Sequence, residues 1–595
     1  GKCCGSATKG ITVLGKFQRT QNANHPNRGT GAGGPKNNRS GRLVDSFVTW
    51  AVGLRFGRPS PWTLATSFIA LIFCAPIVAV LINAAGDSAG LWQHLFETVV
   101  PRYVLNTLVL MTGVGIISLI FGITSAWVVV RYAFFGRRVY QWILLLPAAI
   151  PGYLIAYTYT DFLEFAGPVQ HFLRTFFGWQ SARDYWFPEI RSMGGAMLVM
   201  GAVLYPYIYI MARTAFLLTP ASYFEVAQVS GRNIFWSVAL PLARPAIVAG
   251  LALVLMETIS DFGTVEYFAV ETLTLGIFNV WLGMNNLTAA AQIASCAFLF
   301  IIFLLVLEIL ARAKRRFIDS TRRSVSLIAK PVSGWRAAFC ATVCLIPVIV
   351  GFVIPVGVLI GFILQGYSTT LNNTIIHAAG NSILIGFSVA VLVVATSLFM
   401  GLVVAFNQNK AVRGLAAISS FGYAFPGTIL AVGVVTAGGA LDTQLAALVK
   451  QNFGLEYSGW LTSGFALVVF ACVVRFQAVG YGAVKSGLAR ISTSMIEASR
   501  VLGYGFGRTM GKVILPMISL SCIAGGLLVF VDVMKELPMT LLLRPFNFDT
   551  LATYVYQFAK DELLEEAALP ALAIVITGII PIVLMNAVFN RFRNS

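Results

Sequence analysis

Long apolar stretches alternate with short polar segments along most of the chain, from Trp62 onward. Each stretch is close to the roughly 20 residues that an α-helix needs to cross a bilayer. Twelve such stretches cover approximately residues 62–83, 104–130, 139–162, 194–218, 242–268, 289–311, 337–364, 380–406, 415–440, 463–488, 517–543 and 568–590. The pattern therefore predicts an all-α polytopic membrane protein with twelve transmembrane helices.

The composition supports a membrane protein and argues against a nucleic-acid-binding one. Hydrophobic residues make up 57% of the chain and charged residues only 11%, whereas soluble chains carry about 25% charged residues. The formal net charge is +18. Because the Lys and Arg residues fall between the apolar stretches, contact with anionic membrane lipid explains the charge, and no nucleic acid partner is expected.

Basic residues also predict the orientation of the chain. They recur in every second connecting segment, for example at Arg131, Arg138 and Arg232, while the alternate segments are mixed or acidic, as at Glu562 and Glu565. Lys and Arg mark cytoplasmic segments in membrane proteins. We therefore expect both termini to be cytoplasmic, and residues 1–60, rich in Gly, Asn and basic side chains, to be a disordered cytoplasmic tail.

The chain contains an internal duplication. Pairs of matching residues recur at an offset of 275: Pro151-Gly152 with Pro426-Gly427, Asn106-Thr107 with Asn381-Ser382, and Pro241 with Pro516. The offset predicts two six-helix repeats, and an even number of spans in each makes them parallel, with a pathway between them. The predicted units are a tail at 1–60, repeats at 61–312 and 337–595, and a basic cytoplasmic linker at 313–336.

Two polar, glycine-centred loops interrupt the apolar pattern at equivalent places. Each is predicted to be a short helix that begins near a Glu, is broken six residues later by Gly, and ends at Leu-Pro. A Glu near a helix start would be favoured by the helix dipole, and helix capping is its simplest role. The residues are Glu225, Ala227, Gly231 and Pro241 in the first loop, and Glu497, Ala498, Gly503 and Pro516 in the second. The glutamates are 272 residues apart, so the first loop is three residues shorter.

The second loop resembles the signature loop of binding-protein-dependent ABC importer permeases. The resemblance lies in Glu-Ala, then Gly503, and then Val-Ile-Leu-Pro ending at Pro516; the first loop departs from it by Val226 and by its length. The segments 261–268 and 535–552 resemble ferric iron permeases in particular. The resemblance implies a type I ABC importer permease fold in a bacterial inner membrane.

The same resemblance implies partners and a function. Two copies of a cytoplasmic ATP-binding subunit would dock on the two loops, and a periplasmic solute-binding protein would deliver the substrate. ATP would be consumed by those subunits, because this chain has no G-x-x-x-x-G-K-[ST] phosphate-binding motif. The chain is thus expected to be no enzyme and to bind no cofactor, and ferric iron is the expected substrate. Thiamine, a phosphonate or a polyamine are alternatives, as is an ion-coupled secondary transporter.

Charged residues inside the apolar stretches need a reason, because each costs about 2.5–3.5 kcal/mol at a membrane helix centre. The pattern places two acids in the fifth stretch and two acids with one lysine at matching positions of the eleventh, namely Glu257, Asp261, Asp532, Lys535 and Glu536. We expect them to line the translocation pathway, where carboxylate oxygens would suit a hard cation such as Fe³⁺. No metal site is assigned.

Other roles for these acids stay open from the sequence. They could pair with Lys535 or a nearby Arg, or cap helix breaks at 262–263 and 537–538. Arg213 and Arg475 are expected near the cytoplasmic ends of their helices, with the guanidinium reaching the membrane surface. Pro151-Gly152 and Pro426-Gly427 are expected to unwind or kink the third and ninth spans, either for a pathway or hinge or as ordinary membrane-helix kinks.

Overall fold

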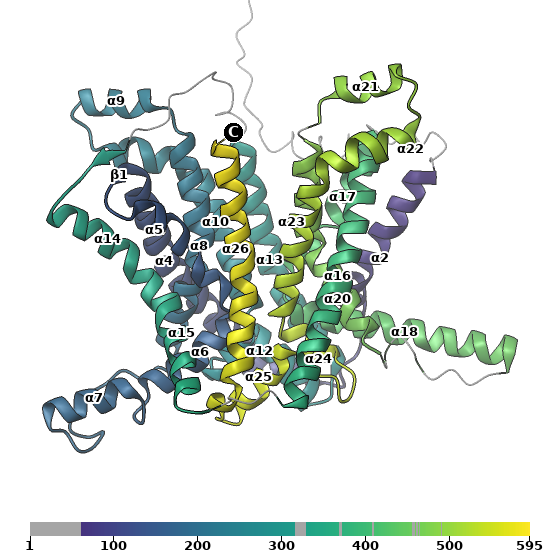
Figure 1. The fold of residues 1–595 in the computed structure, drawn as a ribbon. Coiled ribbons are helices and arrows are strands. Elements are labelled where there is room, and N and C mark those ends of the chain that lie inside the picture. Colours follow the sequence, from purple (N-terminus) through teal and green to yellow (C-terminus); the bar gives the residue numbers. More distant parts are fainter. Residues whose placement is uncertain are drawn as a thin grey trace, which may run out of the picture. The chain divides into compact units, whose positions relative to one another are not determined.

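The computed structural model of this chain describes residues 61–595, apart from 316–328, 368–371, 407–409, 455–458, 460, 461, 463, 490 and 595. The expected tail at 1–60 and most of the expected linker at 313–336 lie outside the described residues. The described part is almost wholly helical, as the apolar pattern predicts (Figure 1).

Among the described residues, eleven helical segments are long and apolar enough to cross a membrane. They are α2 (Pro61–Ala84), α4 (Val100–Arg131), α8 (Met193–Leu218), α10 (Leu240–Ser260), α13 (Leu287–Arg315), α14 with α15 (Trp335–Val348 and Ile354–Leu364, joined by η4, Ile349–Val353), α16 (Asn373–Phe406), α18 (Gly427–Phe453), α20 (Ala466–Leu488), α23 (Leu515–Met534) and α26 (Ala568–Asn594). The expected span at 139–162 is instead a pair of helical segments bent by 92°, which makes a twelfth crossing if the pair counts as one.

Short elements connect these helices. They are α3 (Leu91–Thr98), β1 (Tyr132–Ala133), α5 (Arg137–Ile143), η1 (Leu146–Ala149), α6 (Gly152–Leu163), α7 (Pro168–Phe177), α9 (Ala221–Val229), η2 (Phe235–Ala239), α11 (Gly263–Tyr267), α12 (Leu273–Phe278), η3 (Asn279–Gly283), β2 (Lys330–Pro331), α17 (Lys410–Ile418), η5 (Phe421–Ala424), α21 (Thr493–Val501), α22 (Phe506–Thr509), η6 (Met510–Ile514), α24 (Pro538–Leu543), α25 (Leu551–Lys560) and η7 (Leu564–Ala567). Strand β2, at the end of the expected linker, pairs in parallel with β1 of the first repeat.

Each repeat has a packed centre of three helices. In the first repeat α8 packs against α4 and α10, and in the second α20 packs against α16 and α23. The first helix of each repeat crosses to the other one: α2 packs on α17 and α18, while α14 packs on α4 and α5, and α15 on α6. Both large buried cores consequently contain residues of both repeats, so the repeats interlock rather than meet at one flat surface.

The duplication seen in the sequence is repeated in the hydrogen bonds. Asn106 Nδ2 donates to the backbone carbonyl oxygen of Glu271, and Asn381 Nδ2 donates to that of Asp549. Each N···O distance is 2.9 Å. The next residue on each helix, Thr107 or Ser382, accepts a backbone N–H from the start of α12 or α25 with its hydroxyl. These paired contacts tie the second span of each repeat to the segment that follows its helix break.

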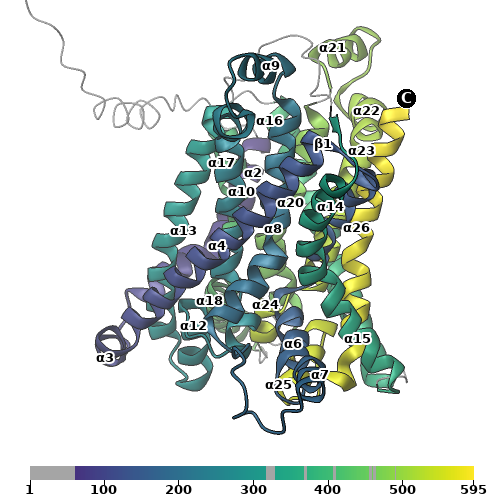
Figure 2. The same cartoon turned by 90° about the vertical axis from the view of Figure 1, so that its left-hand side faces the viewer.

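The two glycine-centred loops lie at one end of the helical bundle. Helices α9 and α21 are at the top of both views, whereas α6 and α25 lie at the opposite end (Figures 1 and 2). After each loop the chain passes through a π-helical segment, η2 or η6, into a long helix. Pro241 and Pro516 occupy the first turn of α10 and α23, where a missing N–H costs no helical hydrogen bond.

Candidate functional site

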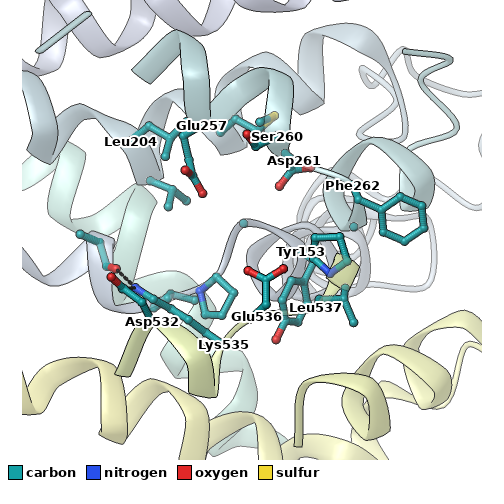
Figure 3. A pocket seen from close by; sticks show the side chains of 18 of the residues that line it. Tyr153, Leu204, Glu257, Ser260, Asp261, Phe262, Asp532, Lys535, Glu536 and Leu537 are labelled. Atoms are coloured by element: carbon teal, nitrogen blue, oxygen red, sulfur yellow. Dashed lines mark hydrogen bonds and ion pairs between the residues drawn. The ribbon is translucent and has the colours of Figure 1, made fainter. Parts of the chain in front are cut away.

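A cavity of about 120 Å³ lies between the two repeats. The first repeat lines it with the start of α6, with α8 and with the end of α10, and the second with α20 and the segment that follows α23. All the charged residues expected in the pathway line it, namely Glu257, Asp261, Asp532, Lys535 and Glu536. Figure 3 shows the two acids of the first repeat facing the charged residues of the second across this space.

The first repeat forms its wall by breaking a helix at Asp261. Helix α10 ends at Ser260, and Asp261 is extended, with φ −66° and ψ 132°. Its Oδ1 accepts the backbone N–H groups of Thr264 at 3.0 Å and Val265 at 3.3 Å, which are free at the start of α11. The carboxylate is therefore a helix cap as well as a cavity residue, because unpaired N–H groups at a helix start require an acceptor.

The second repeat breaks its helix at the matching place. Glu536 Oε1 accepts the backbone N–H of Met539 at 3.2 Å, and its carboxylate pairs with the Arg475 guanidinium at 3.1 Å. The expectation that Arg475 reaches the membrane surface is wrong: both side chains are less than one tenth exposed. Lys535 pairs with Asp532 at 3.2 Å and donates to the Ala148 carbonyl of the first repeat at 3.4 Å. Arg213, by contrast, is half-buried and donates to Gln141 at 3.0 Å.

The two Pro-Gly pairs stand directly against these helix breaks. Pro151 and Pro426 precede α6 and α18, whose first residues are Gly152 and Gly427. A Cβ on Gly152 would lie 3.0 Å from Asp261 Oδ2, and one on Gly427 would lie 2.6 Å from Arg475 Nη1. With a side chain at either glycine, the facing charged group would have to move. Each glycine thus allows the start of α6 or α18 to approach the helix break of its own repeat closely.

The charges of the cavity are unequal between the repeats. At the offset of 275, Arg475 corresponds to Met200 and Lys535 to Ser260. Both acids of the second repeat therefore form an ion pair, whereas Glu257 and Asp261 form none among the described residues. Four acidic side chains face two basic ones in the lining, a formal excess of two negative charges. A position-by-position comparison of the repeats would have indicated Arg475 as a residue of the cavity. The sequence pattern alone placed it near the membrane surface.

The cavity carries further groups that the sequence did not indicate. Tyr153, Tyr207 and Tyr423 line it, and the buried hydroxyl of Tyr153 has no hydrogen-bond partner in the described part of the chain. No three His, Cys, Asp or Glu side chains among the described residues come close enough together to hold a metal ion. In this conformation the acids therefore create a negative potential without forming a coordination site.

Helices α9 and α21 have the same length, nine residues each, and the same ending. Gly231 and Gly503 have φ of 65° and 79°, a left-handed conformation that favours glycine. After each glycine, the next backbone N–H donates to a carbonyl oxygen five residues earlier in the helix. Arg232 donates to Ala227 and Tyr504 donates to Ser499, each with an N···O distance of 3.0 Å. This is the Schellman ending of a helix, and it explains the glycine at this position.

The expected position of the two glutamates was wrong. Glu225 and Glu497 are each the fifth residue of their helix, and neither helix has an acid in its first turn. They therefore cannot cap the helix start, and both are exposed to solvent. Around them Val226, Val229 and Val501 are also exposed, by 66%, 90% and 88%. Each helix thus presents an acid with apolar neighbours on an open surface.

The three-residue difference between the loops lies outside these helices. The offset is 272 up to the glycines and 275 from the π-helical segments η2 and η6 onward. The second copy uses its additional residues for the single turn α22 between Gly503 and η6. Both exposed helices are therefore complete, and only the connection to the following span is shorter in the first repeat.

A duplicated helical bundle with a charged cavity between its repeats and two exposed helices at one end defines a multi-pass membrane permease. Residues 118–319 and 397–594 each match the family described as the binding-protein-dependent transport system inner membrane component. The two matches cover more than half of the chain. The chain belongs to this family, as the permease subunit of an ABC importer, and it carries the family's domain twice.

Similar proteins include both fused and single-copy permeases. The Fe(3+)-transport system permease protein FbpB 2 of Haemophilus influenzae is 24% identical over 544 residues, covering 89% of this chain and 98% of the relative. The ferric transport system permease protein FbpB of Actinobacillus pleuropneumoniae is 21% identical, covering 83% and 73%. The sulfate transport system permease protein CysT of Escherichia coli is 28% identical but covers only 39% of this chain and 85% of its own.

Proposed function

We propose that this permease imports ferric iron by alternating access around the cavity between its repeats. The observation that carries the proposal is the excess of acidic over basic side chains in that cavity, because a negative potential favours a cation and repels an oxyanion. The similarity to ferric permeases along nearly the whole chain supports the same substrate. The sulfate permeases match one part of the chain only, and their substrate has the opposite charge.

The roles proposed for the cavity residues follow from their contacts. Glu257 and Asp261, which form no ion pair among the described residues, would attract the cation, while Arg475 and Lys535 hold the acids of the second repeat. When the two repeats separate toward one side of the membrane, the 3.4 Å contact of Lys535 with the Ala148 carbonyl would be lost. The Pro151-Gly152 and Pro426-Gly427 breaks would carry this movement, since each places a helix start against an acid of the pathway.

Energy would come from two copies of a separate ATP-binding subunit. The exposed surfaces of α9 and α21, with Glu225 and Glu497 in mid-helix, suit docking into a groove of a partner. The two proposed docking loops contain Glu225, Ala227, Gly231, Pro241, Glu497, Ala498, Gly503 and Pro516. Ala227 is buried, at 4% exposure, so it would position α9 rather than contact the partner. A solute-binding protein would dock at the opposite end, where α6 and α25 lie (Figure 2). With α9 and α21 in the cytoplasm, both termini would be cytoplasmic, in a bacterial inner membrane.

Uptake of iron-55 in a strain that lacks the transporter tests the substrate. Expression of this chain with its partners should restore uptake. The double variant Glu257→Gln/Asp261→Asn, which leaves the Arg475–Glu536 pair intact, should reduce uptake while the amount of folded protein in the membrane stays constant. Labelled thiamine and labelled putrescine, both cationic at neutral pH, are measured in parallel. Restored uptake of either compound without iron uptake would refute the choice of ferric iron.

A further inference from the structure

A second cavity, of about 600 Å³, opens at the end of the bundle that carries α9 and α21. It lies between the end of α4, the segment that follows α9, and the first helix of the second repeat, α14. Its aromatic walls are largely open, because Trp236 is 66% and Phe339 61% exposed. Apolar rings open to the surroundings of a membrane helix are the usual contact for lipid chains.

Two arginines, Arg131 and Arg232, line the same cavity. Neither guanidinium makes an ion pair or a side-chain hydrogen bond with any residue that the structure describes. Nearby Arg137 differs, because its Nε donates to the Val129 carbonyl at 2.6 Å and thereby serves the end of α4. Two unpaired guanidinium groups beside an apolar wall form a site for a phosphate group attached to an apolar chain.

We propose that this cavity binds one anionic phospholipid, with its phosphate between Arg131 and Arg232 and its acyl chains against Trp236 and Phe339. A soluble phosphate would have no use for the open aromatic walls, and a neutral lipid would leave the two positive charges unmatched. The proposed cytoplasmic position of this end of the bundle agrees with this occupant, because basic side chains at the cytoplasmic membrane surface attract anionic lipids.

The second repeat does not repeat the two arginines of this site. At the offsets that relate the two repeats here, Arg131 corresponds to Phe406 and Arg232 to Tyr504. The second repeat therefore has no matching pair of arginines. The floor of the cavity also touches the first docking helix: Trp127 lies 5.2 Å from Phe235 and 6.4 Å from Phe224 of α9, between ring centroids. A bound lipid would stabilise the position of α9 and of the segment that follows it. This matters for ATPase docking only if α9 has its proposed role, but the lipid site itself does not depend on that role.

The test measures lipid binding to the purified, delipidated full-length chain by native mass spectrometry. The probes are phosphatidylglycerol, phosphatidylcholine and, as the free headgroup phosphate, glycerol 3-phosphate. The wild type should bind one phosphatidylglycerol per chain more tightly than phosphatidylcholine, without competition from glycerol 3-phosphate at the same concentration. Arg131→Gln/Arg232→Gln should lower phosphatidylglycerol affinity by about thirtyfold, since each arginine near an anionic surface contributes about fivefold. Phosphatidylcholine binding should stay unchanged.

The matched control is Arg138→Gln, which removes an exposed arginine from the same end of the bundle but outside the cavity. Its phosphatidylglycerol affinity should remain that of the wild type. Equal loss in the control would show diffuse attraction by surface charge, and unchanged affinity in the double variant would remove the site. Binding of glycerol 3-phosphate as tight as that of the lipid would show a soluble-anion site instead. If the double variant does not fold, the single variants Arg131→Gln and Arg232→Gln decide, each with a loss of about fivefold.

Discussion

The pair formed by Arg475 and Glu536 allows a quantitative test of the cavity. Both side chains are buried, at 7% and 6% exposure, and among the described residues the carboxylate accepts one further hydrogen bond, from the N–H of Met539. Arg475→Met, the residue that the first repeat has at this position, would leave a buried carboxylate without its cation. Removing one partner of a buried pair costs about 3–5 kcal/mol, so the variant should be strongly destabilised.

Replacing both partners should restore most of the lost stability. In Arg475→Met/Glu536→Gln no charge remains, and the Gln oxygen still accepts the Met539 N–H. Removing both charges of a buried pair is often neutral or stabilising, so the double variant should unfold near the wild-type temperature. The control is Lys535→Met, which breaks a pair whose side chains are 24% and 29% exposed and should cost about 1 kcal/mol or less.

The assay is thermal unfolding in one detergent, followed by size-exclusion chromatography of the protein that stays soluble. The expected order of stability places Arg475→Met well below the other three proteins. A double variant as unstable as Arg475→Met would mean that the Arg475 side chain stabilises by packing rather than by neutralising Glu536. A wild-type melting temperature for Arg475→Met would mean that the pair does not form.

Three further predictions concern the helix break, the docking helices and the unequal charges. Gly427→Ala should lower stability by about 1–3 kcal/mol through its contact with Arg475. Gly439→Ala, in open space on the same helix, should be neutral or stabilising. Melting temperatures measure both effects, and equal effects would refute the role of the close approach at Gly427. Gly503→Val should weaken ATPase-subunit binding in a pull-down far more than Gly503→Asn. The left-handed backbone conformation at this position is more unfavourable for a β-branched residue than for Asn. Equal binding of the two variants would contradict this. Glu257→Gln should raise the KM for transport more than Asp532→Asn, since only Asp532 has a basic partner, and the reverse order would remove the proposed attraction by unpaired acids.

The membrane class and most of the spans could be predicted because each depends on a local property of the sequence. Apolar length predicts a membrane helix wherever it occurs, and an offset of 275 between matching residues predicts a repeat without any knowledge of packing. The bend at Pro151 was also indicated, since proline removes a helical hydrogen bond. The 92° angle at this point depends on contacts with the other spans, and no local signal contains it.

Errors arose where a role depends on what surrounds a side chain. Arg475 lies in an apolar stretch within reach of a cytoplasmic end along the sequence, so reaching the membrane surface was the simplest interpretation. Its place in the fold is decided by Glu536, which is 61 residues away along the chain. Glu497 was placed at a helix start because the resemblance of the loop was given more weight than its local signals. The helix begins four residues earlier, at Thr493, directly after Ser492, a residue type that favours the N-cap.

The duplication itself explains why the cavity can be closed and still keep an excess of acidic side chains. Two identical repeats would bring the same acids together from both sides, and the second repeat avoids this repulsion by having Arg475 and Lys535 where the first has Met200 and Ser260. The two basic residues neutralise one wall and allow the repeats to meet, while the other wall keeps its negative charge. For the proposed cation, Glu257 and Asp261 are the cavity acids that are not held in an ion pair among the described residues. The two ion pairs of the second repeat need not break when the cation binds. The repeats can therefore differ in charge and still move apart and together as a unit.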